Sequence, residues 1–548
     1  MGTAKWQSYP RPQMRREGYK ILNGAWKLQG HEIEVPFVPQ SRLSGYQGVI
    51  TEEMLYVTEF EVPEEFHQPR LLLHFGAVDE EAVIIVNGKI VGEHKGGYLP
   101  FSVEITEVVK RGEKNELKVA IIDRLTRKYP YGKQCKKRGG MWYTPISGIW
   151  QTVWLEEVPD SYIEDIKITP ALASVKIELK AQTEGFKAIV SGEGMEPMEY
   201  EFAQNAGKLC IENPNNWTVD NPYLYNVKII TETDEVDSYF ALRTVEVKEV
   251  DGIQRICLNN KPIFMHGVLD QGYFEDGIFL PEDEKEYERD ILRMKELGFN
   301  MLRKHIKIEP EIFYYECDRL GMLVLQDMVN NGGYSYISDT VLPTLGFKKK
   351  NDCRGLKKDL ERKQIFEMHM VDTLNDLYNH PCIIGYTIFN EGWGQFESDR
   401  MYDIAKGIDS TRFYDSTSGW FAQKKSDVDS EHIYFRAKEL HAKTRPMFLS
   451  ECGGFSYRIE GHIFNPNKSY GYGTCTSAEE LTDRIIDMYK VMVLPGIKGG
   501  VCGCVYTQVS DVEDEINGMY TYDRQICKVN KEKMQKLAIQ IMEQINIL

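Results

Sequence analysis

The segment CIIGYTIFN, from Cys382 to Asn390, is apolar at almost every position. A strand with apolar residues at successive positions is buried on both faces, which is typical of a parallel sheet covered by helices. Similar runs lie in the same half of the chain: IFMHGV (263–268), NMLR (300–303), MLVLQ (322–326), RFYDS (412–416), HIYF (432–435), PMFLSE (446–451) and GVCGCVYTQ (500–508). Eight strands that alternate with helices or long loops predict a (β/α)8 TIM barrel over residues 251–548.

The segments between these strands have the period of amphipathic helices. In EDEKEYERDILRMKELGFN, Tyr287, Ile291, Met294 and Leu297 share one helical face, and Gly298 ends the helix. Further helices are expected over about 310–320, 358–378 and 478–492, and another amphipathic helix closes the chain. A doubly wound sheet is the alternative, but no glycine-rich phosphate-binding motif supports it.

Two β-rich blocks precede the predicted barrel. In the first, EAVIIVNGKIVGEH (81–94) has the pair Asn87-Gly88 between two apolar runs, which is the strongest short-range signal of a hairpin. Its short strands predict a jelly-roll β-sandwich over residues 1–158. The second block has about seven short strands in residues 159–250, which predicts an immunoglobulin-like β-sandwich. The expected organisation is therefore three domains, with the barrel last.

The composition excludes several classes of protein. The 548 residues include 83 acidic and 66 basic side chains, and the formal net charge is −17. Phosphate-rich partners select basic surfaces, so neither nucleic acid nor a membrane is an expected partner. No apolar run is long enough to span a membrane, and the first residues lack the apolar core of a signal peptide. The 11 cysteines contain no C-x-x-C pair. We expect reduced thiols in a cytoplasmic protein.

Two glutamates stand where the active site of a TIM barrel is found. Glu391 follows the fourth predicted strand and Glu451 follows the seventh. Strand C-terminal ends line the active-site face, and a carboxylate after such an apolar run is costly to bury without a partner. Two carboxyl groups about 5 to 5.5 Å apart are what retaining glycoside hydrolysis needs. The alternative is that each glutamate ends its strand in a solvated loop.

Motifs along nearly the whole chain match one family in order and spacing. They are LHFGAVDEEAVIIVNGKIVGEHKGGYLPF, SGIWQTVWLE, NPYLYNVKI, FALRTVEV, GFNMLRKHIKIEPEIFYYECDRLGMLVLQDM, GYTIFNEGWG, FLSECGG and GMYTYDR. In this order the chain resembles glycoside hydrolase family 2, which includes β-galactosidases, β-glucuronidases and β-mannosidases. The resemblance implies that Glu391 is the general acid/base and Glu451 the nucleophile. It further implies that Asn390 binds the sugar 2-OH, that Tyr434 orients the nucleophile and that Arg303 lies beneath it. A core aromatic and a structural ion-pair member are the alternatives for Tyr434 and Arg303.

The chain departs from its relatives at positions that bear on the substrate. β-Glucuronidases read the sugar carboxylate with an Asn-x-Lys motif, where this chain has Glu515 and Asn517. An acidic residue there would repel a uronate, so β-glucuronidase activity is a less favoured prediction. A different cation remains open, and the candidates are Lys304, Arg458 and Lys468. The segment LQDMVNNGG (325–333) lacks the Glu-x-His magnesium ligands of large β-galactosidases. We therefore predict no metal and no cofactor.

Other side chains are candidates for binding the sugar. Trp393 and Trp420 are candidate stacking platforms, with core packing as the alternative, and Tyr506 stands where relatives often have Trp. His305 is displaced by one residue from the family's histidine and is kept as a candidate contact. Asp270, with Gln271, follows the first strand and could bind hydroxyl groups, unless both are solvated.

The expected function is a retaining exo-β-glycosidase, with a β-galactosidase-like activity first. A β-galacturonidase, β-glucuronidase, β-mannosidase or α-L-arabinosidase remains open within the enzyme class. From another class, the chain could be a non-catalytic carbohydrate-binding protein that uses its jelly roll. The expected partner is a carbohydrate or glycoconjugate, and a homo-oligomer stays open.

Overall fold

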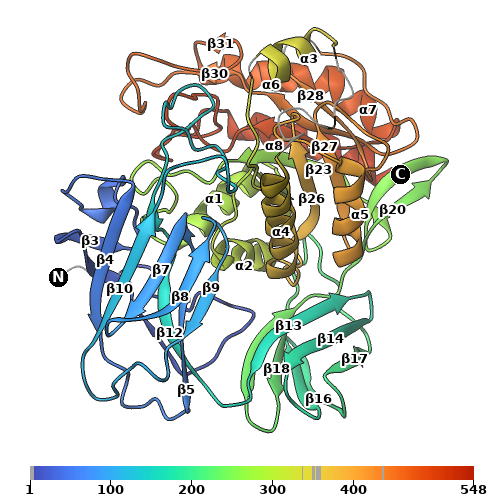
Figure 1. The fold of residues 1–548 in the computed structure, drawn as a ribbon. Coiled ribbons are helices and arrows are strands. Elements are labelled where there is room, and N and C mark those ends of the chain that lie inside the picture. The colour runs from blue at the N-terminus through green and yellow to red at the C-terminus, as the bar shows by residue number, and fades with distance from the viewer. Residues whose placement is uncertain (1–4, 336, 348–351, 353–358, 435–436, 548) are drawn as a thin grey trace.

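The computed structural model describes residues 5–335, 337–347, 352, 359–434 and 437–547. Two β-sandwiches stand beside a barrel of parallel strands that helices surround (Figure 1). The predicted fold class, with a jelly roll, an immunoglobulin-like sandwich and a TIM barrel, is confirmed.

The first sandwich consists of a four-stranded and a six-stranded antiparallel sheet. In sheet order the strands are β1 (Tyr19–Ile21), β12 (Val153–Val158), β5 (Arg70–Phe75) and β9 (Phe101–Glu104), and β3 (His31–Val35), β2 (Gly24–Leu28), β4 (Glu53–Phe60), β10 (Asn115–Ile122), β7 (Glu81–Val86) and β8 (Lys89–Lys95). Buried and half-buried residues alternate along β10, so one face packs into the core between the sheets. The predicted hairpin joins β7 to β8, and Asn87 and Gly88 both have positive φ, as a type I′ turn requires.

The second sandwich has seven strands and a hydrophobic core of its own. One sheet contains β13 (Ile163–Pro170), β14 (Ser174–Ala181) and β17 (Ala206–Cys210), and the other contains β16 (Met195–Phe202), β15 (Phe186–Gly192), β18 (Tyr225–Ile230) and β19 (Glu235–Phe240). A small sheet of β20 (Val245–Val250), β21 (Ile253–Leu258) and β22 (Lys261–Pro262) leads from this sandwich into the barrel.

Eight parallel strands form the barrel. Their sheet order is β27 (Phe413–Ser418), β26 (Ile383–Asn390), β25 (Leu323–Asp327), β24 (Met301–Lys304), β23 (Met265–Asp270), β32 (Val501–Thr507), β29 (Met447–Gly453) and β28 (Asp429–Ile433). The sheet closes because its two end strands, β27 and β28, contact each other. All eight residues of β26 are buried, as expected of a strand covered on both faces. The alternative of a doubly wound sheet is wrong.

Helices cover the outside of the barrel. They are α1 (Lys285–Glu296), α2 (Glu311–Leu320), α4 (Leu360–Asp376), α5 (Ser398–Ile408), α6 (Ala478–Met492), α7 (Leu494–Lys498) and α8 (Lys531–Asn546). Tyr287, Ile291 and Met294 of α1 are buried, as the periodicity predicts. The helix predicted over 358–378 begins at residue 358, which lies outside the described residues, and α4 covers most of the rest. No helix in the described ranges is long and apolar enough to cross a membrane.

The sixth strand differs from its prediction. It spans Asp429–Ile433 rather than 432–435, and residue 435 lies outside the described residues. Its first residues are polar, so the start of the strand does not coincide with an apolar run. The barrel tolerates them because they are hydrogen-bonded: Ser430 Oγ donates to Asp415 Oδ1 at 2.9 Å.

A long connection between β10 and the two-residue strand β11 (Gly148–Ile149) leaves the first sandwich and reaches the barrel. We call it the 123–147 loop; it rises in cyan beside the barrel in Figure 1. The Tyr131 N–H donates to the Asn330 carbonyl at 3.0 Å, and the Thr144 N–H donates to Glu513 Oε1 at 2.9 Å. Those partners follow the barrel strands β25 and β32, so the loop lies at the C-terminal ends of the strands.

Candidate active site

Glu391 and Glu451 meet at the C-terminal end of the barrel. Glu391 directly follows β26, and Glu451 lies in β29 where the pairing with β32 is irregular. An irregularity of this kind re-aims a side chain. Both residues are buried, and a carboxylate oxygen of one lies within 4.8 Å of a carboxylate oxygen of the other. The sequence pattern placed both glutamates at strand ends, and the fold brings them together.

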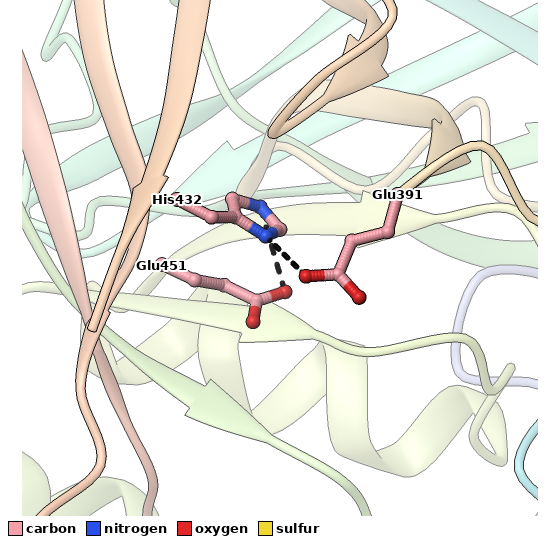
Figure 2. A group of neighbouring side chains, drawn as sticks. All are labelled: Glu391, His432 and Glu451. Atoms are coloured by element: carbon pink, nitrogen blue, oxygen red, sulfur yellow. Dashed lines mark hydrogen bonds and ion pairs between the residues drawn. The ribbon is translucent and has the colours of Figure 1, made fainter. Parts of the chain in front are cut away.

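His432 connects the two carboxylates. Its Nδ1 lies 2.8 Å from Glu391 Oε1, and its Nε2 lies 3.7 Å from Glu451 Oε1. Ser418 Oγ is 3.0 Å from the same Nε2 and helps to fix the ring. Figure 2 shows the imidazole with both carboxyl groups turned towards it. Within the described ranges, the potential ligand atoms of these three side chains are also close enough to one another to hold a metal ion. Their mutual hydrogen bonds and ion pairs account for that closeness.

Arg303 holds the nucleophile candidate and its neighbour in place. The guanidinium is fully buried and donates from Nη1 to Glu451 Oε1 at 3.1 Å and from Nη2 to Asn390 Oδ1 at 2.9 Å. It also donates from Nε to Asp327 Oδ1 at 3.0 Å and from Nη1 to the Ser450 carbonyl. Because Asn390 Oδ1 is engaged by Arg303, the amide nitrogen of Asn390 is left as a donor.

Tyr434 contacts the other oxygen of Glu451. Its hydroxyl donates to Glu451 Oε2, and its ring stacks on Tyr472 with centroids 4.2 Å apart. Tyr434 lies one residue beyond β28, so the end of that strand sets its position. Arg303 and Tyr434 therefore hold Glu451 from both oxygens.

The pKa values of the two glutamates move in opposite directions. Burial raises the pKa of Glu391, and the hydrogen bond from His432 only partly offsets it. Burial also acts to raise the pKa of Glu451, but His432 and Arg303 outweigh it and lower the pKa to about 2. The separation means that Glu391 binds a proton more readily than Glu451 does, and that Glu451 is the more readily ionised of the two. One acid and one nucleophile in a single site is the division that a double-displacement hydrolase needs.

Glu391 occupies a strained backbone position. Its φ is +50°, in the left-handed region that residues with a Cβ rarely adopt, and its N–H donates to the Ser418 carbonyl at 3.0 Å. Gly392 follows with φ of +76°, and a Cβ there would lie 2.5 Å from the Phe421 ring. Strain of this kind persists where surrounding contacts enforce it, and it is concentrated at functional sites.

Comparisons with known proteins agree with this geometry. Residues 28–146 match the galactose-binding domain-like model of glycosyl hydrolase 2, residues 161–243 match the glycosyl hydrolases family 2 model, and residues 245–447 match the TIM barrel domain of that family. Together the three matches cover most of the chain in the family's order. The chain belongs to glycoside hydrolase family 2. The resemblance seen in the sequence motifs is thereby confirmed.

Members of family 2 with two different names are similar to this chain. A β-galactosidase of Thermoanaerobacter pseudethanolicus is 28% identical over 427 residues, which cover 71% of this chain and 53% of that protein. A putative β-glucuronidase of Formosa agariphila is 26% identical over 447 residues, which cover 72% and 49%. The chain thus spans about half the length of these curated relatives. The solved structure of a β-D-glucuronidase from Dictyoglomus thermophilum superposes with a TM-score of 0.76 at 19% identity, over 97% of this chain and 98% of that one, and shares the fold.

The two tryptophans that are candidate stacking platforms lie near Glu391 and His432. The Trp393 ring is buried, its centroid is 6.5 Å from that of His305, and its Nε1 has no hydrogen-bond partner among the described residues. The Trp420 ring lies 5.3 Å from the His432 ring, and its Nε1 donates to the Asp339 carbonyl at 3.0 Å. Both positions are consistent with a platform at the site, which stays a prediction.

The polar candidates on the first two strands are already paired. Asp270 accepts from Lys304 Nζ at 2.6 Å, and the same ammonium donates to Glu309 at 2.9 Å. His305 Nδ1 lies 2.7 Å from Asp327 Oδ2, and burial lowers the pKa of His305 to about 4. Lys304 is therefore satisfied inside the protein and is a poor candidate for binding a uronate.

Three candidates show no contact with either carboxylate among the described residues. The Tyr506 hydroxyl accepts from the Phe455 N–H at 3.3 Å, and its ring packs on Gly453 near α6. Tyr506 follows Cys504 by two residues on β32, and both face the helix layer, so the structure does not bring Tyr506 into the site. Arg458 pairs with the exposed Glu460, and Lys468 is exposed.

The structure adds residues that sequence reasoning missed. His432 precedes Tyr434 by two positions in the predicted strand 432–435, and this same-face spacing is a signal in the sequence. Lys133 and Tyr143 come from the 123–147 loop and had no local signal, because only the packing of two domains brings them here. The Tyr143 hydroxyl donates to Glu515 Oε2 at 2.5 Å.

Proposed function

We propose that the chain is a retaining exo-β-glycosidase in which Glu451 is the nucleophile and Glu391 the general acid/base. The observation that carries this proposal is the buried pair of carboxylates within 4.8 Å of each other, with pKa values shifted in opposite directions. Retaining enzymes hold their two carboxyl groups closer than inverting enzymes, which leave room for a water between them. A non-catalytic carbohydrate-binding protein gives no reason for such an opposed pair.

In the first step Glu451 attacks the anomeric carbon while Glu391 protonates the departing oxygen. Arg303 and Tyr434 hold Glu451 as an ionised, oriented carboxylate. The free amide N–H of Asn390 is directed to donate to the sugar 2-OH, a contact that strengthens as positive charge develops on the ring. The product of this step is a glycosyl ester on Glu451.

In the second step Glu391, now ionised, removes a proton from water as that water attacks the anomeric carbon. The sugar leaves with its original configuration, and Glu451 is regenerated as a carboxylate. A hydrogen bond from His432 Nδ1 stabilises the ionised form of Glu391 that acts here. His432 therefore counteracts the burial of Glu391, which on its own favours only the acid.

A β-galactoside is the substrate that we propose first, and a β-glucuronide is the second candidate. Relatives carry both names, so they do not separate the two. The buried Glu515 carboxylate stands where a glucuronidase presents its motif, and it disfavours an acidic sugar. β-Galacturonides, β-mannosides and α-L-arabinosides complete the panel to be tested.

The test combines a panel of p-nitrophenyl glycosides with trapping by the matching 2-deoxy-2-fluoro glycosides. We expect one sugar mass on Glu451 in the trapped protein. Glu391→Gln is expected to lower kcat/KM by about 10²- to 10⁴-fold, and azide, which needs no general base, should restore part of the second step. Glu460→Gln is a matched control because Glu460 is exposed. Wild-type rates in both Glu391→Gln and Glu451→Gln would refute the proposal.

A further inference from the structure

Lys133 is a buried cation without a counterion. It belongs to the 123–147 loop of the jelly roll and is 5% exposed. Within the described ranges its Nζ makes no hydrogen bond or ion pair; it lies 4.7 Å from the centroid of the Trp393 ring and 5.7 Å from that of Trp142. Burying an ammonium group is costly unless acceptors surround it, so a lone buried lysine at a site points to a ligand that supplies them.

The position of Lys133 at the active site is fixed by the loop. The Tyr143 N–H donates to the Lys133 carbonyl at 3.1 Å, and the Cys135 N–H donates to the Tyr143 carbonyl at 3.1 Å. Tyr143 then anchors this paired segment to the barrel through its bond to Glu515. Trp393, on which Lys133 lies, is two residues from Glu391. Lys133 therefore lies on Trp393, close in the chain to Glu391, and on a segment that Tyr143 ties to Glu515.

Glu515 faces the same space from the barrel. Its Oε2 accepts from Tyr143, and its Oε1 accepts from Asn517 Nδ2 at 2.9 Å. Burial lowers the pKa of Lys133, and the carboxylates of Glu515, Glu451 and Glu391 act in the opposite direction. Even so, Lys133 Nζ and the Glu515 oxygens do not form an ion pair. The Lys133 ammonium and the Glu515 carboxylate are thus not paired with each other.

We propose that Lys133 and Glu515, one from each domain, bind hydroxyl groups of the terminal sugar and select a neutral sugar over a uronic acid. This rests on the proposed glycosidase function. A hydroxyl group both donates and accepts hydrogen bonds, so it fits between an ammonium and a carboxylate. A sugar carboxylate would place a further negative charge beside Glu515 and Glu451, and one lysine would have to neutralise it.

The test measures how each protein responds to loss of a sugar hydroxyl. The substrates are p-nitrophenyl β-D-galactoside, or the neutral glycoside that the wild type hydrolyses faster, with its 4-deoxy and 6-deoxy counterparts and the corresponding uronide. In the wild type, loss of the bound hydroxyl is expected to lower kcat/KM by about 10- to 100-fold. In Lys133→Met that ratio is expected to fall to within about threefold, because the donor is gone. In Glu515→Gln it is expected to fall less, because the amide oxygen still accepts a hydrogen bond but carries no charge.

Control variants separate recognition from structure. We call the kcat/KM of the parent glycoside divided by that of its deoxy counterpart the deoxy ratio. Lys136→Met removes an exposed lysine of the same loop and is expected to leave the deoxy ratio unchanged. Lys133→Met is expected to melt at or above the wild-type Tm, because it removes a buried charge that has no counterion. A role in holding the domains together would instead lower the Tm and leave the deoxy ratio unchanged, which overturns the proposal.

Each remaining outcome tests either the role of Lys133 or the glycosidase function. If the wild type hydrolyses the uronide faster and Lys133→Met removes that preference, Lys133 binds a carboxylate and the proposal is wrong. If Glu451 is labelled by the 2-deoxy-2-fluoro glycoside while the deoxy ratio survives in Lys133→Met, the glycosidase function stands and the role of Lys133 falls. If the wild type neither hydrolyses any glycoside nor becomes labelled, the glycosidase function and the role of Lys133 are both wrong.

Discussion

Replacing His432 by Phe should move the pH dependence of catalysis towards higher pH. The substitution keeps an aromatic ring of similar size but removes the 2.8 Å contact to Glu391 and the 3.7 Å contact to Glu451. Both contacts favour the ionised carboxylates, so the pKa of each glutamate rises when they are lost. The acidic limb of the profile reports ionisation of Glu451, and the alkaline limb reports deprotonation of Glu391. Both limbs should therefore move upward.

The size of the shift follows from the strength of one hydrogen bond. A hydrogen bond to a charged group contributes about 1.5 to 3 kcal/mol, and one pKa unit corresponds to about 1.4 kcal/mol. Because Glu391 is buried and has His432 as its hydrogen-bond partner in the described structure, we expect its limb to move by about one to two pH units. The movement of the Glu451 limb should be smaller, because the contact is longer and Arg303 remains.

The assay is kcat/KM on a p-nitrophenyl glycoside between about pH 2 and pH 10, so that it covers both limbs, with product measured after quenching. His67→Phe serves as the control, because His67 is exposed. Thermal unfolding of each variant shows whether the fold is intact. An alkaline limb that stays in place or moves to lower pH would refute the role given to His432.

Three further outcomes are expected. Arg303→Gln should lower kcat/KM and also reduce stability by about 3 to 5 kcal/mol, because it leaves the buried Asp327 without its cation; chemical unfolding and activity are the measurements. Tyr434→Phe should raise the pKa of Glu451, and the acidic limb of the rate profile should move up while the Tm changes little. Glu311, whose pKa burial raises to about 8 beside Asp376, is protonated in the fold, so stability should fall as pH rises through that value; Glu311→Gln should raise the Tm at pH 9 but not at pH 4.

The barrel and its two carboxylates could be predicted because their signals are local. The run that ends at Asn390 is apolar on both faces and is followed at once by Glu391, and Glu451 follows a similar run. The sixth strand was misplaced because its polar residues are satisfied by contacts across the barrel, such as Ser430 with Asp415, which a single sequence does not show.

The remaining site residues depend on tertiary packing. Tyr506 stands at the predicted strand end, but the alternation of β32 turns it towards the helices, and strand position alone does not fix the face. Lys133 is separated from Glu515 by most of the chain, and it approaches the carboxylates only because the 123–147 loop crosses between domains. From the sequence alone, a charged loop residue that enters a site cannot be distinguished from one that is solvated.

The 123–147 loop also bears on how such a site changes during evolution. In the roles proposed above, the acid and the nucleophile belong to the barrel, whereas Lys133 in the wall around the sugar belongs to the jelly roll. Exchange of the N-terminal domain between relatives would alter that wall while leaving Glu391, His432 and Glu451 untouched. The reaction and the choice of sugar can therefore change independently of each other, even though both are carried out in one site.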